Sequence, residues 1–175
     1  MTSGEWLKDL IRDIPDFPEP GVIYKDITPL LGDVDALRFV VDAIVDRFSG
    51  TDVAKVLGIE ARGFILAAPI AYRLGTGFVP VRKPGKLPHD VVDTTYELEY
   101  GTDGLAMHVD AVEAGSNVLI VDDVLATGGT AAATCELVDR VGANVVGCAF
   151  LAELDFLGGR SRLPGRELMS LVRFP

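Results

Sequence analysis

The stretch Val118-Leu-Ile-Val-Asp-Asp-Val-Leu-Ala-Thr-Gly-Gly-Thr130 decides the fold of this chain. Its apolar run is unbroken, and a strand half exposed to water would alternate apolar and polar residues. The run therefore predicts a strand that is buried on both faces in a parallel sheet. Two adjacent acids, Asp122 and Asp123, end the run, and a glycine-rich turn leads from them into a helical pattern.

The turn at Gly128 and Gly129 is suited to a phosphate group. Glycine lets backbone amides approach a ligand closely, and the start of the next helix adds free N–H groups and the positive end of its dipole. The two preceding carboxylates are suited to the vicinal hydroxyls of a ribose. Together they predict a sugar-phosphate site. The alternative, a plain turn with a threonine cap, leaves two acids without partners at the end of a buried strand.

Composition narrows the class of protein. The chain has 175 residues, of which 49% are hydrophobic and 24% charged, as in a single folded domain. A net charge of −10 argues against nucleic acid or an anionic membrane as a partner. Neither a signal peptide nor an apolar run of ~20 residues is present, so we expect a cytoplasmic protein. Cys135 and Cys148 lie in apolar patterns, which favours core positions over a disulfide or a metal site.

Hydrophobic periodicity predicts alternating elements along the chain. Helices are expected over 6–14, 37–48, 64–74 and 130–141, with Asp33 or Asp35 as a cap of the second. Strands are expected over 53–59, 78–81 and 144–151, besides the one beginning at Val118, with an edge strand at 168–174. A hairpin is expected from 95–100 and 105–109 around the glycines of 101–104.

This order predicts an α/β fold, namely an open, mainly parallel sheet flanked by helices on both faces. We expect one domain over residues 1–175, with a core of about 33–152 and a small hood lobe from about 1–32 and 153–175. The ligand is expected at the carboxyl ends of the strands, where both Arg62 and the loop from Asp122 to Thr130 leave the sheet.

Residues 118–130 resemble the phosphoribosyl pyrophosphate (PRPP) motif of the type I phosphoribosyltransferases. In that family the two acids hold the ribose hydroxyls, which implies this role for Asp122 and Asp123. The turn that wraps the 5′-phosphate would comprise Ala126, Thr127, Gly128, Gly129 and Thr130. Further blocks at 18–27, 58–64, 81–88, 96–101 and 153–154 resemble the adenine phosphoribosyltransferases within this family, so that the likeness spans about residues 16–160.

The resemblance implies a purine salvage enzyme that converts adenine and PRPP to AMP and pyrophosphate. Pyrophosphate would be bound by Glu60, Ala61, Arg62, Arg82, Lys83 and Lys86, with a cis peptide bond between the first two and with the last sometimes supplied by a neighbouring subunit. Taken alone, Arg62 could be a surface arginine, and 82–86 could be a solvated basic turn. Residues 83–104 resemble a lid that excludes water.

An acid–base residue is expected near the purine, as is a wall for its ring. Glu97 and Glu99 share one strand face, so spacing leaves both open; the family pattern selects Glu99, acting with Arg62 as the catalytic pair. Tyr100 would then be a lid aromatic, or else a strand-packing tyrosine. The resemblance places adenine between Tyr24 and Leu154, read by main-chain groups of Ile23 and Lys25.

Cofactor, assembly and rival functions follow from the same resemblance. Mg²⁺ would arrive with PRPP, since the sequence offers no metal-binding cluster of its own. A homodimer is expected from the family. The alternatives are a xanthine or a hypoxanthine/guanine phosphoribosyltransferase, and a PRPP-sensing regulator. The short acidic segment before the first sheet strand argues against the regulator, because it is unsuited to binding DNA.

Overall fold

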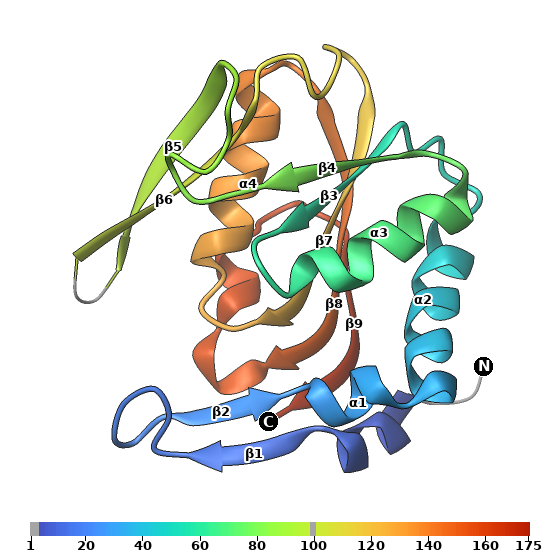
Figure 1. The fold of residues 1–175 in the computed structure, drawn as a ribbon, viewed down its shortest axis with the longest axis vertical. Helices are drawn as coiled ribbons and strands as arrows, with labels where there is room; N and C mark the ends of the chain where they lie inside the picture. The colour runs from blue at the N-terminus through green and yellow to red at the C-terminus, as the bar shows by residue number, and fades with distance from the viewer. Residues whose placement is uncertain (1–3, 99–100) are drawn as a thin grey trace.

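The apolar run that begins at Val118 lies in the middle strand of a five-stranded, all-parallel sheet (Figure 1). The computed structural model describes residues 4–98 and 101–175. The sheet order is β4-β3-β7-β8-β9. Its strands are β3 (Lys55–Ile59), β4 (Gly77–Val81), β7 (Asn117–Leu125), β8 (Asn144–Leu154) and β9 (Leu168–Phe174). The predicted fold class is therefore confirmed, including the edge strand at the C-terminal end of the chain.

Helices cover both faces of this sheet (Figure 1). One face packs against α2 (Val34–Phe48) and α3 (Gly63–Leu74), with the short helix α1 (Thr28–Gly32) and the 3₁₀ segment η1 (Gly4–Leu10) beside them. The other face packs against α4 (Gly129–Arg140) and the hairpin of β5 (Val91–Leu98) and β6 (Gly101–His108). No described helix is both long and apolar enough to cross a membrane.

Strand β7 explains why its sequence is apolar without alternation. Leu119 and Val121 belong to the core under α2 and α3. Val118 and Ile120 belong to the opposite core, under α4. All four side chains are fully buried, because successive residues of a strand point to opposite faces and here both faces are covered.

The N-terminal prediction is only partly correct. The predicted helix over 6–14 is a 3₁₀ segment that ends at Leu10, and Arg12–Pro15 form strand β1. This strand pairs antiparallel with β2 (Ile23–Asp26), with Ile14 opposite Tyr24. Helical spacing identified the apolar positions correctly, since Leu7 and Ile11 are buried. The pairing with β2 overrides the helix beyond that point, because tertiary pairing outweighs local propensity.

The hairpin is also shifted from its predicted position. Gly101–Gly104 were expected to form its turn, but they lie in β6, paired with 95–98 of β5. Gly104 serves a close approach instead of a turn, because a Cβ there would lie 3.0 Å from Pro84 Cγ and 3.1 Å from the Thr94 carbonyl oxygen. The connection between the strands falls at 99–100, outside the described residues.

Two cysteines occupy core positions, as the apolar pattern predicts. Cys135 and Cys148 are buried free thiols whose sulfur atoms lie 3.9 Å apart.

At the C-terminal end, β9 pairs with β8 in the main sheet although the prediction assigned its residues to the hood. The turns η2 (Asp155–Leu157) and η3 (Gly159–Arg162) lie between these two strands in the chain.

Candidate functional site

The carboxyl ends of β3 and β7 bring two predicted segments together. The two strands are neighbours, with Gly58 opposite Val121, so that the turn at 60–62 and the acids of β7 emerge side by side. Gly63 makes this contact close, because a Cβ there would lie 2.8 Å from Asp122 Oδ1 and 2.9 Å from the Val121 carbonyl oxygen. The glycine after the arginine is thus a packing requirement of the site.

A cavity of about 390 Å³ opens at this edge of the sheet. It is lined by Ile23, Tyr24, Lys25, Glu60, Ala61, Arg62, Asp122, Asp123, Ala126, Thr130 and Leu154, all of them predicted site residues, and by Val22, Val124 and Leu157, which the sequence did not single out. The three additions are apolar and flank predicted positions by one to three residues. No chemical signature distinguishes them from core residues in the sequence.

The two acids at the end of β7 differ in their surroundings. Asp123 is buried, and its Oδ2 lies 2.7 Å from Nε of Arg62. Asp122 accepts the Asp123 amide on Oδ1. Burial, followed by the charge of Asp123, raises the pKa of Asp122 well above its usual range. The pair therefore resists carrying two negative charges until a ligand offers donors to both.

Arg62 links the acids of β7 to residues of β2. Its Nη1 donates to the Tyr24 hydroxyl and, at 3.4 Å, to the Lys25 carbonyl oxygen. The guanidinium also lies 4.8 Å from the centre of the Tyr24 ring, in a cation–π contact. One arginine thus touches Asp123 on the sheet and Tyr24 on β2 together, and it is partly buried between them.

The glycine-rich turn has the geometry of an anion-binding helix start. Gly128 has a φ of 82°, which glycine adopts without a steric penalty, and it forms the N-cap of α4. It has no side chain with which to cap the amides of the first turn. A small hollow of about 50 Å³ lies here, lined by Asp122, Val124, Leu125, Ala126, Thr127, Gly128, Thr130, Ala131 and Phe150.

The turn after β3 contains the predicted unusual bond. The Glu60–Ala61 peptide bond is cis, which confirms that prediction. Glu60 accepts the Lys83 amide at 2.9 Å and is bonded by the Arg82 guanidinium at 3.2 and 3.3 Å. Burial opposes ionisation, but these donors hold the pKa of Glu60 below its ordinary value. Glu60 thereby fixes the start of the basic segment beside the cavity.

The remaining predicted residues either lie around this cavity or fall outside the residues that the structure describes. Of the described residues that line the two cavities, none is Gly129, Arg82, Lys83 or Lys86, although Arg82 donates to the carbonyl oxygen of Lys86 and thus holds the basic turn together. Glu99 and Tyr100 lie outside the described residues. In the described ranges, no group of three or more His, Cys, Asp or Glu side chains is arranged to hold a metal ion.

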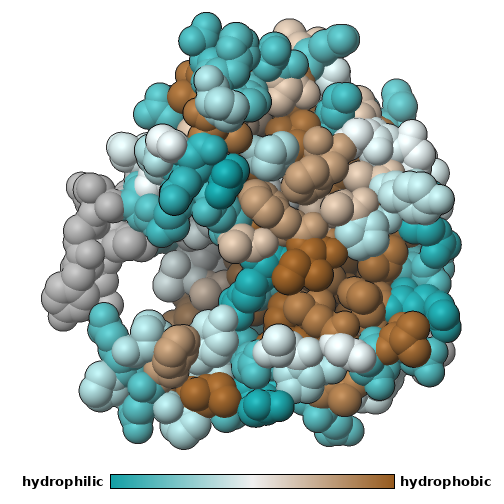
Figure 2. Space-filling model, viewed as in Figure 1, coloured by the Kyte–Doolittle hydropathy of each residue, from teal (hydrophilic) through white to brown (hydrophobic). Residues whose placement is uncertain are grey.

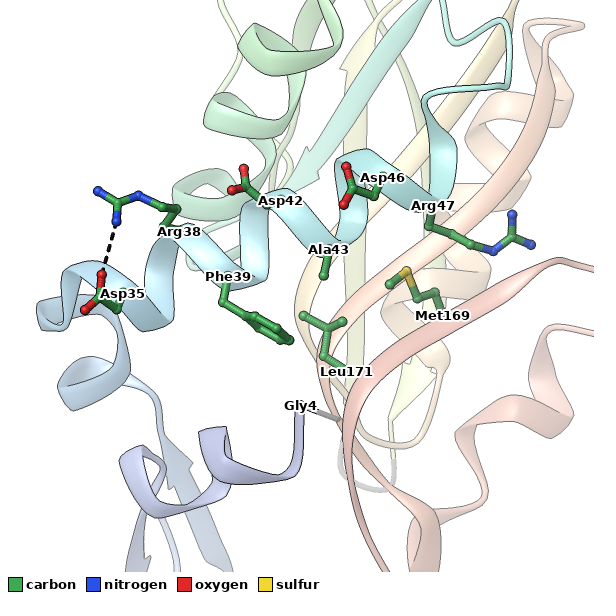
Figure 3. Close-up of a pocket in the computed structure, with 10 residues that line it drawn as sticks. All are labelled: Gly4, Asp35, Arg38, Phe39, Asp42, Ala43, Asp46, Arg47, Met169 and Leu171. Carbon is green, nitrogen blue, oxygen red and sulfur yellow. Dashed lines mark hydrogen bonds and ion pairs between the residues drawn. The ribbon is translucent and has the colours of Figure 1, made fainter. Parts of the chain in front are cut away.

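A larger cavity of about 830 Å³ lies elsewhere, between α2 and β9 (Figure 3). Phe39, Ala43 and Leu171 form an apolar floor, and charged side chains of α2 stand along the rim. Two of them, Asp35 and Arg38, pair with each other at 3.1 Å. Predicted site residues do not contribute to the described lining, so we place the functional site at the sheet edge.

Comparison with known proteins identifies the family. A family model for the phosphoribosyl transferase domain matches residues 29–165. The chain is 58% identical over 170 residues to the adenine phosphoribosyltransferase of Acidothermus cellulolyticus, with 97% of this chain and 96% of that protein covered. It is 56% identical over 168 residues to that of Geobacter metallireducens, with 96% and 98% covered.

The chain belongs to the adenine phosphoribosyltransferase family.

Solved adenine phosphoribosyltransferases share the fold along nearly the whole chain. The enzyme of Thermoanaerobacter pseudethanolicus superposes with a TM-score of 0.95 at 50% identity, covering 98% of this chain and 100% of that one. The Saccharomyces cerevisiae enzyme, solved with D-2,5-dideoxy-2,5-imino-altritol 1,6-bisphosphate and adenine, gives 0.91 at 41% identity, with 96% and 97% covered.

Proposed function

We propose that this adenine phosphoribosyltransferase family member transfers the 5-phosphoribosyl group of PRPP to N9 of adenine, giving AMP and pyrophosphate. One observation carries the proposal: a single cavity joins the acid pair and the phosphate turn to Tyr24 and Leu154. PRPP and adenine would be bound next to each other in this one cavity. The adenine bound in the Saccharomyces cerevisiae relative supports the choice of base.

At the donor end, each group would bind the part of PRPP that matches its chemistry. Asp122 and Asp123 would accept the ribose 2′ and 3′ hydroxyls, whose O–H groups would offset the repulsion between the two carboxylates. The turn formed by Ala126, Thr127, Gly128, Gly129 and Thr130 would hold the 5′-phosphate through its amides and the start of α4.

Pyrophosphate would bind on the β3 side of the cavity. The Glu60–Ala61 turn would offer backbone groups, and Arg62 would supply charge close to the ribose carbon. The leaving pyrophosphate would then be attracted outward by the positive charges of Arg82, Lys83 and Lys86. The carboxylate of Glu60 holds this basic segment in place. This local positive charge offsets the net charge of −10 that would otherwise repel PRPP.

At the acceptor end, Tyr24 and Leu154 would hold the adenine ring. Main-chain groups of Ile23 and Lys25 would read its edge, because N1 accepts from an N–H and the 6-amino group donates to a C=O. Hypoxanthine and guanine present the reversed pattern and would leave buried backbone groups unpaired, at a cost of roughly 1–3 kcal/mol each.

We propose Glu99 as the acid–base residue, supported by its place in the family pattern. As N9 attacks C1′ and pyrophosphate leaves, the carboxylate of Glu99 would accept the proton on N7 of the reacting purine tautomer, so that the proton that adenine loses passes to Glu99. Residues 83–104 would close over the site as a lid, with Tyr100 near the substrates, to exclude water that competes for the ribosyl carbon.

Mg²⁺ would come with PRPP. The cavity presents carboxylate oxygens of Glu60, Asp122 and Asp123, which are donors of the type that Mg²⁺ prefers. These few oxygens suit an ion that keeps substrate phosphates and water as its other ligands. When bound, the ion would neutralise charge on the diphosphate.

We also propose a cytoplasmic homodimer built from single-domain subunits. In each subunit, β1, β2 and the segment of η2 and η3 would form the hood over the site. Support for the dimer comes from α3, where Ile65 and Tyr72 are 45% and 84% exposed, with Ala68 exposed between them. Figure 2 shows hydrophobic residues gathered over and beside α3 on this face.

A spectrophotometric assay for nucleotide formation tests the reaction. The purified chain is given PRPP and Mg²⁺ with adenine, hypoxanthine, guanine or xanthine in parallel, and each substrate is also omitted in turn. We expect AMP from adenine alone, with kcat/KM at least about 100-fold above that of the other bases. A preference for another purine would reassign the acceptor. Calorimetry that finds no PRPP binding to folded protein would refute the donor site.

A further inference from the structure

Glu153 is a buried charge at the carboxyl end of β8. Only 3% of its surface is exposed. Both of its oxygens are bonded by the guanidinium of Arg160, at 2.6 and 2.8 Å, and Ser170 donates to Oε2 at 2.7 Å. Burial alone would raise the pKa of Glu153, but the hydrogen bonds from Arg160 and Ser170 hold it below its usual value. The carboxylate is therefore ionised at neutral pH and bonded by Arg160 and Ser170, with Nε of Arg173 farther away at 3.8 Å.

The segment that Arg160 belongs to returns to the PRPP loop. Gly159 packs its backbone directly against the loop, because a Cβ there would collide with the Ala126 carbonyl oxygen and would lie 3.1 Å from the Gly128 nitrogen. In the opposite direction, a Cβ on Gly128 would collide with the Gly159 carbonyl oxygen. Two glycine backbones thus meet face to face where the turn must present its amides.

The pair and the glycine contact form one connection. Glu153 sits in the sheet beside Leu125 of β7, so it is fixed by the strand register. The bidentate bond between Glu153 and Arg160 then holds the η3 turn in a fixed position relative to the sheet. Gly159, next to Arg160, packs against the backbone of Ala126–Gly128 and thereby fixes its position. In the described structure neither Glu153 nor Arg160 lines the substrate cavity.

We propose that Glu153 and Arg160 are positioning residues that set the PRPP loop through Gly159. The inference rests on the proposed function, since it concerns the same donor site. Loss of the pair releases the η3 turn, and the loop amides then no longer converge on one phosphate position. Displaced amides bind the 5′-phosphate less tightly, whereas the groups around the ribosyl carbon keep their places once PRPP is bound.

Replacement of Arg160 tests the positioning role. With Arg160→Ala we expect KM for PRPP to rise about tenfold, while kcat at saturating substrate and KM for adenine change by less than about threefold. Arg160→Lys keeps the charge but loses the fork, and it should give an intermediate KM. Equal rises in both KM values, or a KM for PRPP within twofold of the parent protein, would overturn the proposal.

Arg166→Ala is the matched control. Arg166 belongs to the same C-terminal segment and makes a single ion pair, 2.6 Å from the half-exposed carboxylate of Asp139 near the end of α4, away from the PRPP loop. Its loss should leave KM for PRPP within twofold. If Arg166→Ala raises KM for PRPP as much as Arg160→Ala does, loosening of the C-terminal segment in general is responsible and the proposal fails.

Gly159→Ala tests the connection without touching the ion pair, and it serves if Arg160→Ala does not fold. Its added methyl must push the Ala126–Gly128 backbone, so KM for PRPP should again rise selectively. Gly50→Ala is its control, because a Cβ there meets nothing within 4 Å. The parent protein separates the two levels of inference: an inactive parent removes the function, whereas an active parent with unaffected variants removes only the positioning role.

Discussion

At the scale of single residues, the two acids of the site differ in whether their negative charge is balanced by a positive neighbour. Asp123 has the guanidinium of Arg62 at 2.7 Å, whereas Asp122 has a pKa raised by burial and by its neighbour. Adjacent carboxylates in one strand end would repel each other if both were charged and unpaired. The site thus carries a stability cost at Asp122 that ligand binding would relieve.

Asp122→Asn should stabilise the ligand-free protein and abolish PRPP binding. Because the folded protein favours the protonated acid, ionisation of Asp122 costs stability as pH rises above the unfolded pKa of about 3.9. The substitution removes that cost, so the free energy of unfolding at pH 7 should rise by about 1 kcal/mol, with no gain near pH 3. Urea melts at both pH values and calorimetry with PRPP measure the two effects.

Asp123→Asn should change the free energy of unfolding in the opposite direction. It removes the charge paired with Arg62, so the free energy of unfolding should fall by roughly 1–2 kcal/mol. If both asparagine variants shift stability in the same direction, the two acids do not differ in the way described.

Glu99→Gln should lower kcat about 100-fold and leave KM for PRPP within about threefold. The amide cannot accept the proton that adenine loses, but it leaves the donor site untouched. Glu97→Gln is the control, since both acids share the same strand pattern. Steady-state kinetics of AMP formation decide between them, and the assignment moves to Glu97 if that variant alone loses turnover.

At the scale of elements, helix α2 shows how a choice left open by the sequence was made. Both Asp33 and Asp35 were candidate caps; Asp33 accepts the amides of Asp35 and Ala36 at 3.0 and 2.9 Å. Asp35 instead pairs with Arg38 at 3.1 Å on the exposed face. A cap needs an extended residue just before the first turn, and the Asp33 backbone meets that condition.

Asp33→Ala should lower the free energy of unfolding by about 1 kcal/mol without changing kcat or KM, because two helix amides lose their acceptor. Asp33→Ser should restore most of the loss. Asp35→Ala should change stability by less than about 0.5 kcal/mol, since its ion pair is exposed. Thermal or urea unfolding measures all three, and equal losses for Asp33→Ala and Asp35→Ala would contradict the assignment.

At the scale of the whole molecule, one face of α3 remains to be covered. Ile65 and Tyr72 lie seven residues apart on a helix, with Ala68 between them on the same face. An apolar stripe of this kind beside further hydrophobic residues is typical of an association surface. It lies next to the turn at 60–62, so a partner seated there would be close to the side of the site proposed to bind pyrophosphate.

Tyr72→Glu should weaken self-association at least tenfold, because a charge would be buried in an apolar contact. Light scattering after size exclusion, over a range of concentrations, should show the parent as a dimer and the variant shifting to monomer. Val109→Glu, on a residue that is 45% exposed beyond β6, is the control and should stay dimeric. Dimers of unchanged stability in Tyr72→Glu would move the interface elsewhere.

Much of the fold could be predicted because its signals are local. The apolar run ending in Asp122, the glycine turn and the helix after it are contiguous in the chain, and so are the helical patterns of α2 and α3. The errors concern segments whose structure depends on distant partners. β1 becomes a strand only because β2 pairs with it, and Gly104 lies in a strand because β5 pairs with 101–104.

The sequence by itself determined the sheet, the glycine turn and the chemical types at the site, since periodicity and short motifs report which faces are buried and which groups follow a strand. Only the tertiary structure decided which distant side chains meet. Arg62 contacts both Tyr24 and Asp123, and Glu153 is held by Arg160 behind the loop, because strand order and the return of the η3 turn bring them together. Such pairings depend on three-dimensional register, which no local pattern records.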